Sequence, residues 1–239
     1  MKKKVLGLIA LLLVFIPIVT NAKTYNVDDD MSINIEDDNW YVFTRDNIKN
    51  NKELDELGIT YDYMNDLFTN YHIYLDATIF YGKNNFIELL VRKKEVDEVK
   101  NLTNYSNEEI MEFALELAKK TGSTDYKIYE NDYKFVESKY LDKEVGYYIL
   151  EYSTVVNGTN YTITVQKTSK FNASEEKNIK KAIDSIKFNI DESLKEKKDN
   201  SLSTNSIISK AVVGAITGGI IGFIYWIFNR KKNKKVSNI

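Results

Sequence analysis

The sequence predicts an α+β domain, an antiparallel sheet of about six to eight strands with packed helices, followed by one C-terminal transmembrane helix. Three observations predict this. Several segments alternate apolar and polar residues with the period of two that is typical of strands. Between them lie capped, helix-length segments with apolar stripes. Near the end, residues 211–228 form an uncharged apolar run of 18 residues, and a helix of that length rises about 27 Å, close to the bilayer hydrocarbon thickness.

The first elements follow from local signals. Residues 32–45 contain two short alternating segments, which predict two strands paired in a short hairpin with Trp40 near the corner between them. A short helix is expected over 51–57, ended by Gly58, and a second helix is expected after the capping residue Thr60. Its apolar face consists of Met64, Leu67 and Phe68.

Two longer strands are predicted next, over 71–81 and 87–92. Pairing them through a three-residue loop, 83–85, places Ile79 opposite Leu89. This register keeps apolar residues on one face, whereas a two-residue loop would place Ile79 opposite Glu88. The other face is expected to point outward.

The second half has clearer signals. Ser106 and Glu109 have the spacing of a capping box, which predicts a helix that ends at Gly122. Asn157-Gly158 between two alternating segments predicts a type I′ hairpin with one apolar and one polar face. A last helix is expected from Asn172, with Ile179, Ala182, Ile183 and Ile186 turned inward.

The chain is predicted to divide into five parts. Residues 1–22 have the features of a secretory signal peptide, with three lysines, an apolar run and cleavage after Ala22, although the sequence leaves open whether it is cleaved or kept as an anchor. Residues 23–190 form the extracytoplasmic domain, 191–210 a polar linker, 211–228 the transmembrane helix and 229–239 a basic tail. By the positive-inside rule this tail, with Arg230, Lys231 and Lys232, lies in the cytoplasm of a single-pass cell-membrane protein.

Composition excludes several classes of function. The sequence has no cysteine, so it has no disulfide scaffold, thiol nucleophile or cysteine metal site. Of the 33 basic residues, eight lie in the signal and the tail, which leaves 25 basic against 35 acidic residues in 23–210. A formal charge of −10 there argues against nucleic acid as a partner and is compatible with cationic partners.

The order of these elements resembles the PsbP-like fold. The resemblance covers about Ile33 to Phe188 and is carried by the segments 40–43 (Trp-Tyr-Val-Phe) and 182–188 (Ala-Ile-Asp-Ser-Ile-Lys-Phe). This group includes the photosystem oxygen-evolving subunit and many bacterial secreted proteins. The resemblance implies an accessory or binding module and brings no catalytic residues with it.

Candidate sites for chemistry are few. His72, the single histidine, shares the predicted outward face with Asp76 but stands about 13 Å from it, too far for direct pairing. Asp76, Glu88 and Glu130 are carboxylates that a glycan hydrolase could use. The acidic clusters 28–30 and 36–38 lack the ligand spacing of a calcium loop. We therefore expect no metal, no cofactor and no catalytic site, and solvated surface residues instead.

The apolar run contains a spacing signal. Gly214, Gly218 and Gly222 repeat every four residues, which allows close packing of two helices in lipid, in a homodimer or with another membrane protein. Tyr225 and Trp226 are expected to anchor the helix at the inner interface of the bilayer, its other partner.

Together these observations favour a membrane-anchored extracytoplasmic binding or assembly module without catalysis of its own, acting through protein partners at the cell envelope. Two alternatives remain open. One is a carboxylate-dependent hydrolase of wall glycans. The other is a sensor or regulator that acts through pairing of its transmembrane helix.

Overall fold

The computed structural model describes residues 22–36, 39–81, 85–96, 99–121 and 123–194. The predicted signal peptide up to Asn21, the linker after Leu194, the transmembrane helix and the basic tail lie outside these residues. Within the described part, no helix is both long enough and apolar enough to cross a membrane.

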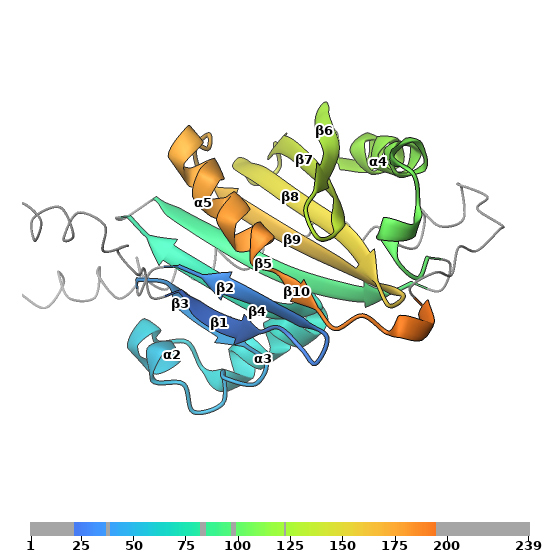
Figure 1. Cartoon of the computed structure of the whole chain (residues 1–239). Helices are drawn as coiled ribbons and strands as arrows, with labels where there is room; N and C mark the ends of the chain where they lie inside the picture. Colours follow the sequence, from blue (N-terminus) through green and yellow to red (C-terminus); the bar gives the residue numbers. More distant parts are fainter. Residues whose placement is uncertain (1–21, 37–38, 82–84, 97–98, 122, 195–239) are drawn as a thin grey trace, which may run out of the picture.

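Two antiparallel sheets form the domain (Figure 1). The larger has seven strands in the order β3-β4-β5-β9-β8-β7-β6, and the smaller has the order β1-β2-β10. Their bounds are β1 Lys23–Asn26, β2 Met31–Ile35, β3 Tyr41–Thr44, β4 Ile73–Phe80, β5 Phe86–Glu95, β6 Asp125–Glu130, β7 Lys134–Asp142, β8 Tyr147–Val156, β9 Thr159–Lys167 and β10 Lys187–Phe188.

Helices cover both faces of the larger sheet, so the domain has three layers (Figure 1). On one face, helix α5 and the smaller sheet enclose the main core; on the other, α2 with α3 and α4 with η1 enclose two further clusters. The helices are α2 Lys52–Leu57, α3 Tyr61–Asn70, η1 Leu102–Asn104, α4 Asn107–Thr121, α5 Ala173–Asp184 and η2 Glu192–Leu194. The predicted α+β class with an antiparallel sheet is confirmed.

Caps and turns define the helix ends as expected. Gly58 ends α2 with a φ of 71°, and the Thr60 side chain accepts a hydrogen bond from the amide of Tyr63 at the start of α3. Capping boxes, in which a side chain and a backbone amide bond reciprocally, begin α4 and α5.

The hairpin of β8 and β9 confirms its predicted register. Asn157 and Gly158 have positive φ angles of 52° and 76°, as a type I′ turn requires. From this turn Tyr152 pairs with Ile163, and Glu151 pairs with Thr164.

Three predictions about the strands were wrong. In β4 and β5, Ile79 pairs with Ile87 rather than Leu89, because the strands continue pairing closer to the turn, where Phe80 pairs with Phe86 and the Tyr81 amide bonds to the Asn85 carbonyl. The strands on either side of Trp40, β2 and β3, lie in different sheets and do not pair.

The third error concerns the face of β4 and β5 that was expected to point outward. Its residues Asp76 and Glu88 are only 1% and 0% exposed. Helices on both faces of the sheet explain this, since a three-layer domain leaves no solvated side on its central strands.

Candidate functional site

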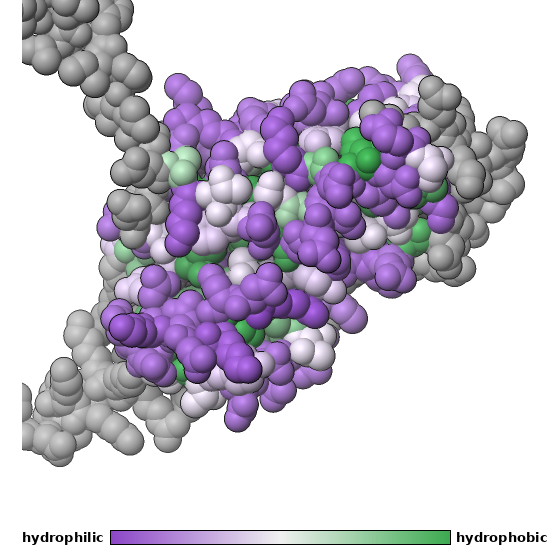
Figure 2. Space-filling model, turned by 60° about the horizontal axis from the view of Figure 1, so that its bottom comes forward, coloured by the Kyte–Doolittle hydropathy of each residue, from purple (hydrophilic) through white to green (hydrophobic). Residues whose placement is uncertain are grey.

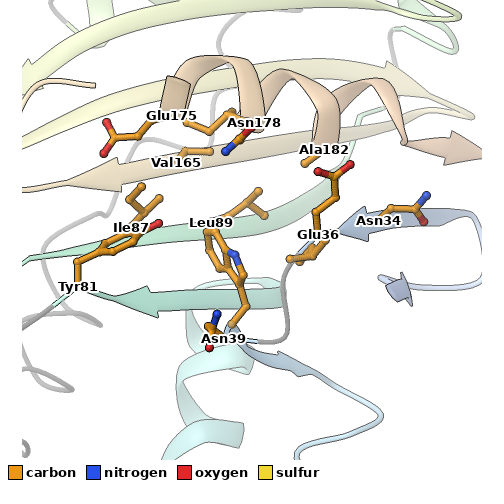
Figure 3. Close-up of a pocket in the computed structure, with 13 residues that line it drawn as sticks. Asn34, Glu36, Asn39, Tyr81, Ile87, Leu89, Val165, Glu175, Asn178 and Ala182 are labelled. Carbon is orange, nitrogen blue, oxygen red and sulfur yellow. The ribbon is translucent and has the colours of Figure 1, made fainter. Parts of the chain in front are cut away.

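A groove between α5 and the smaller sheet is the leading candidate site. It encloses about 610 Å³, within the range of small-molecule and peptide sites. Its floor is aliphatic, formed by Ile87, Leu89 and Val165 of the central strands, and its α5 wall by Ile179 and Ala182 (Figure 3). The remaining lining residues are Asn34, Ile35, Glu36, Asn39, Trp40, Tyr81, Glu175 and Asn178.

Chain connectivity positions the two walls. After α5 the chain turns at Ser185 and enters β10, which pairs with Ser32 and Met31 at the start of β2. The Ser185 hydroxyl accepts a hydrogen bond of 2.8 Å from the Asn34 amide, so the end of α5 is fixed to β2. Because β10 has only two residues and pairs only with Met31 and Ser32, it leaves the end of β2 uncovered on that side, where Asn34, Ile35 and the following Glu36 line the groove.

Two aromatic side chains lie at the groove. Trp40 is half-buried and packs against the main core, while Tyr81 is 57% exposed. On the face seen in Figure 2 most of the surface is hydrophilic, with only small apolar areas between polar side chains. Ile87, Leu89 and Val165 are only 4%, 4% and 0% exposed, so Trp40 and Tyr81 supply most of the accessible apolar surface at the groove.

The carboxylates of the groove differ in their surroundings. Glu175 forms an ion pair of 2.5 Å with Lys167, whose side chain is only 4% exposed. Its carboxylate also accepts the hydrogen bond from the Asn172 backbone amide that completes the capping box of α5. Glu36 pairs with Lys181 at 3.1 Å, and both side chains are exposed. In Figure 3 the Glu36 side chain reaches across the groove toward α5, whereas the Glu175 carboxylate lies at its outer end. Glu175 is thus a structural group, and Glu36 is available to a ligand.

A second group of charged side chains is buried on the opposite face of the sheet. Thr78 donates a 3.0 Å hydrogen bond to Asp76 Oδ1, and Gln166 donates one to Glu88 Oε2. The other carboxylate oxygens, Asp76 Oδ2 and Glu88 Oε1, are buried without a hydrogen-bond partner. Burial raises the pKa of Asp76 to about 7, and burial together with the charge of Asp76 raises the pKa of Glu88 well above its ordinary value.

Further buried polar and charged side chains lie beside Asp76 and Glu88 on strands β5, β9 and β8. Arg92 donates a 2.9 Å hydrogen bond to the Thr164 hydroxyl, which in turn donates to Glu151 at 3.3 Å. Burial raises the pKa of Glu151, and the charge of Arg92 opposes that rise. Asp76, Glu88, Arg92 and Glu151 are each at most 4% exposed, so their charges act within the fold.

Of the carboxylates considered from the sequence, the structure brings Asp76 and Glu88 together and leaves Glu130 apart, exposed on the edge strand β6. His72 is exposed, with a φ of 54°, and precedes β4. His72 is thus a surface residue, as expected, whereas Asp76, which was expected on the same outward face, is buried.

The acidic cluster 28–30 has a structural role. The Asp28 carboxylate accepts hydrogen bonds from the backbone amides of Asp30 and Met31, which shapes the turn into β2. It also forms an ion pair of 2.6 Å with Lys93. Across the described residues, no group of three or more His, Cys, Asp or Glu side chains is placed to hold a metal ion. Positions 37 and 38 of the other cluster lie outside the described part.

The predicted helix-packing and membrane-anchor residues also lie outside the described part: Gly214, Gly218, Gly222, Tyr225, Trp226, Arg230, Lys231 and Lys232. The groove itself was not predicted. Trp40 was identified only as a corner residue, and Ile87, Leu89 and Val165 as core. The one usable signal was an isolated tryptophan beside a polar turn.

Comparisons with known proteins bear on the fold only. No family model matches the sequence, and no curated protein matches it. Among solved structures, the chain is similar to cyanobacterial PsbP (CyanoP) from Synechocystis sp. PCC 6803 at 10% identity and a TM-score of 0.43, over 71% of this chain and 94% of that one. The expected PsbP-like resemblance is thus found as a distant one of fold.

Proposed function

We propose that this chain is a membrane-anchored extracytoplasmic binding module that engages a protein partner at the cell envelope, with the groove between α5 and β2 as its binding site and no catalysis of its own. The observation that carries this proposal is the groove, with its aliphatic floor and the aromatic side chains Trp40 and Tyr81. A site of this kind gains affinity by removing apolar surface from water, about 25 cal/mol per Å².

Anchoring rests on the sequence. The apolar run 211–228 and the basic residues after it favour a single span with the domain outside. Strand β1 begins at Lys23, one residue after the predicted cleavage position, so removal of the signal would leave the domain intact.

The groove is less suited to glycan hydrolysis. Acid–base catalysis by two carboxyl groups needs one of them held protonated near neutral pH and both open to substrate. In the groove Glu36 and Glu175 are each paired with a lysine, and the carboxyl groups with raised pKa values, Asp76, Glu88 and Glu151, are buried elsewhere.

Chemical crosslinking in cells tests this proposal, using tagged full-length chain, Trp40→Ala and Gly218→Ile, with partners identified by mass spectrometry. A partner lost only in Trp40→Ala supports binding through the groove. A partner lost only in Gly218→Ile supports the alternative of a regulator that acts through helix pairing. Near-UV circular dichroism verifies that both variants are folded. If the wild type and Trp40→Ala give the same partners, the groove is not the binding site.

A further inference from the structure

The groove offers one accessible carboxylate to a ligand. Glu175 is neutralised by Lys167 at 2.5 Å, whereas Glu36 is exposed, and no lysine or arginine is among the described residues that line the groove. Asn34, Asn39 and Asn178 add amide groups at its polar edge. The aromatic faces of Trp40 and Tyr81 also attract cations, because the ring quadrupole is negative above the ring plane.

The lysines near the groove are already engaged by other groups. Lys167 neutralises Glu175, and only 4% of its side chain is exposed. On α5, Lys180 lies over the ring of Tyr129, 5.7 Å from its centroid. Lys181 pairs with Glu36 in an exposed ion pair. Such a pair is worth little in water, so an incoming cation can replace Lys181.

We infer that the groove recognises a basic side chain of its polypeptide partner, with the aliphatic stem against the partly exposed Trp40 and Ala182 and the cationic head between Glu36 and the aromatic rings. Lysine and arginine bury their methylene stems on apolar surface while the charged head keeps polar partners. A volume of about 610 Å³ holds such a side chain together with its flanking residues. This inference rests on the proposed function and names the chemistry of its partner.

Charge reversal at Asn178 tests the inference directly. Asn178 is exposed on α5 and lines the groove, so Asn178→Glu and Asn178→Arg both add bulk there and differ in charge. The chain has two tryptophans, Trp40 and Trp226. In the full chain carrying Trp226→Phe, purified in detergent, tryptophan emission therefore reports on the groove alone.

The probes are three acetylated, amidated hexapeptides of alternating leucine with lysine, glutamine or glutamate. The lysine peptide should shift Trp40 emission and bind at least about tenfold more tightly than the glutamine peptide at low salt. Asn178→Glu should tighten lysine-peptide binding and Asn178→Arg should weaken it, each about three- to tenfold, as expected for charges a few ångströms apart near a surface. Glu36→Gln should also weaken it, while Glu53→Gln, an exposed change on α2, should not.

The inference is overturned if the three peptides bind equally, if none binds, or if the two Asn178 variants change affinity in the same direction. Free lysine amide, used in a parallel titration, should bind far more weakly than the peptide; equal affinity would indicate a small cation instead of a polypeptide. If charge has no effect while crosslinks in cells still depend on Trp40, this inference fails and the proposed function stands. If those crosslinks also survive Trp40→Ala, both fail.

Discussion

The buried carboxyl group of Asp76 makes the stability of the domain depend on pH in an unusual direction. In the folded chain the pKa of Asp76 is about 7, raised from an ordinary value of 3.8 chiefly by burial. Between these values the unfolded chain releases the proton while the folded chain keeps it. The contribution of Asp76 to the free energy of unfolding is therefore greatest below about pH 4 and decreases as the pH rises to about 7. The folded and unfolded pKa values differ by about three units, and at about 1.4 kcal/mol per unit this lowers the free energy of unfolding by about 4 kcal/mol.

Asp76→Asn removes this loss. An asparagine oxygen can still accept the hydrogen bond from Thr78, and the neutral amide no longer repels Glu88. We expect the free energy of unfolding of Asp76→Asn to exceed that of the wild type by about 2–4 kcal/mol at pH 8 and to match it within about 1 kcal/mol at pH 4.

The assay is urea denaturation of the full chain in detergent from pH 4 to 8, followed by near-UV circular dichroism. Glu130→Gln, which changes an exposed carboxylate on β6, is the matched control and should follow the wild type at every pH. A wild type that gains stability from pH 5 to 8, or an Asp76→Asn variant no more stable than the wild type at pH 8, would show that the folded domain does not hold Asp76 protonated.

Three further predictions concern turns, caps and the membrane helix. Gly158→Ala should lower the free energy of unfolding by more than the roughly 1 kcal/mol expected of Gly146→Ala. Both glycines have a positive φ. A Cβ added at Gly158 would lie 3.3 Å from the Val96 carbonyl oxygen, whereas a Cβ added at Gly146 would have no atom within 4 Å. Equal urea midpoints would contradict this. Asn172→Ala removes the N-cap of α5 and should cost about 1 kcal/mol in the same assay; an unchanged midpoint would show that the cap is dispensable. Gly218→Ile should preserve the near-UV spectrum of the domain while weakening helix–helix crosslinks in the membrane, and undiminished crosslinks would exclude the glycine stripe as a contact.

The turns show which parts of the fold a sequence specifies by itself. At Asn157-Gly158 the two residues require positive φ angles, so the turn type and the register of β8 and β9 follow from local chemistry. Between β4 and β5 the sequence has no Asn-Gly pair that would specify the turn type. A shift of two residues leaves each side chain on the same face, so hydrophobic alternation could not distinguish Ile79 opposite Ile87 from Ile79 opposite Leu89.

The position of the helices was not predictable in the same way. Alternation in β4 and β5 is what a half-solvated strand shows, and it gave Asp76 and Glu88 as surface residues. Their burial is a tertiary effect of helices on both sides of the sheet. The groove is likewise built from residues far apart in the sequence, such as Trp40 and Asn178, and no local pattern connects them.

Site-specific photo-crosslinking in cells is the sharpest test of binding through the groove. A photoreactive amino acid is placed at Asn178, in the groove, or at Glu112, which is exposed on α4 on the opposite face of the sheet. We expect a discrete crosslinked partner from position 178, none from position 112, and loss of that product when Trp40→Ala is added. The same product from both positions, or none from position 178, would contradict binding through the groove.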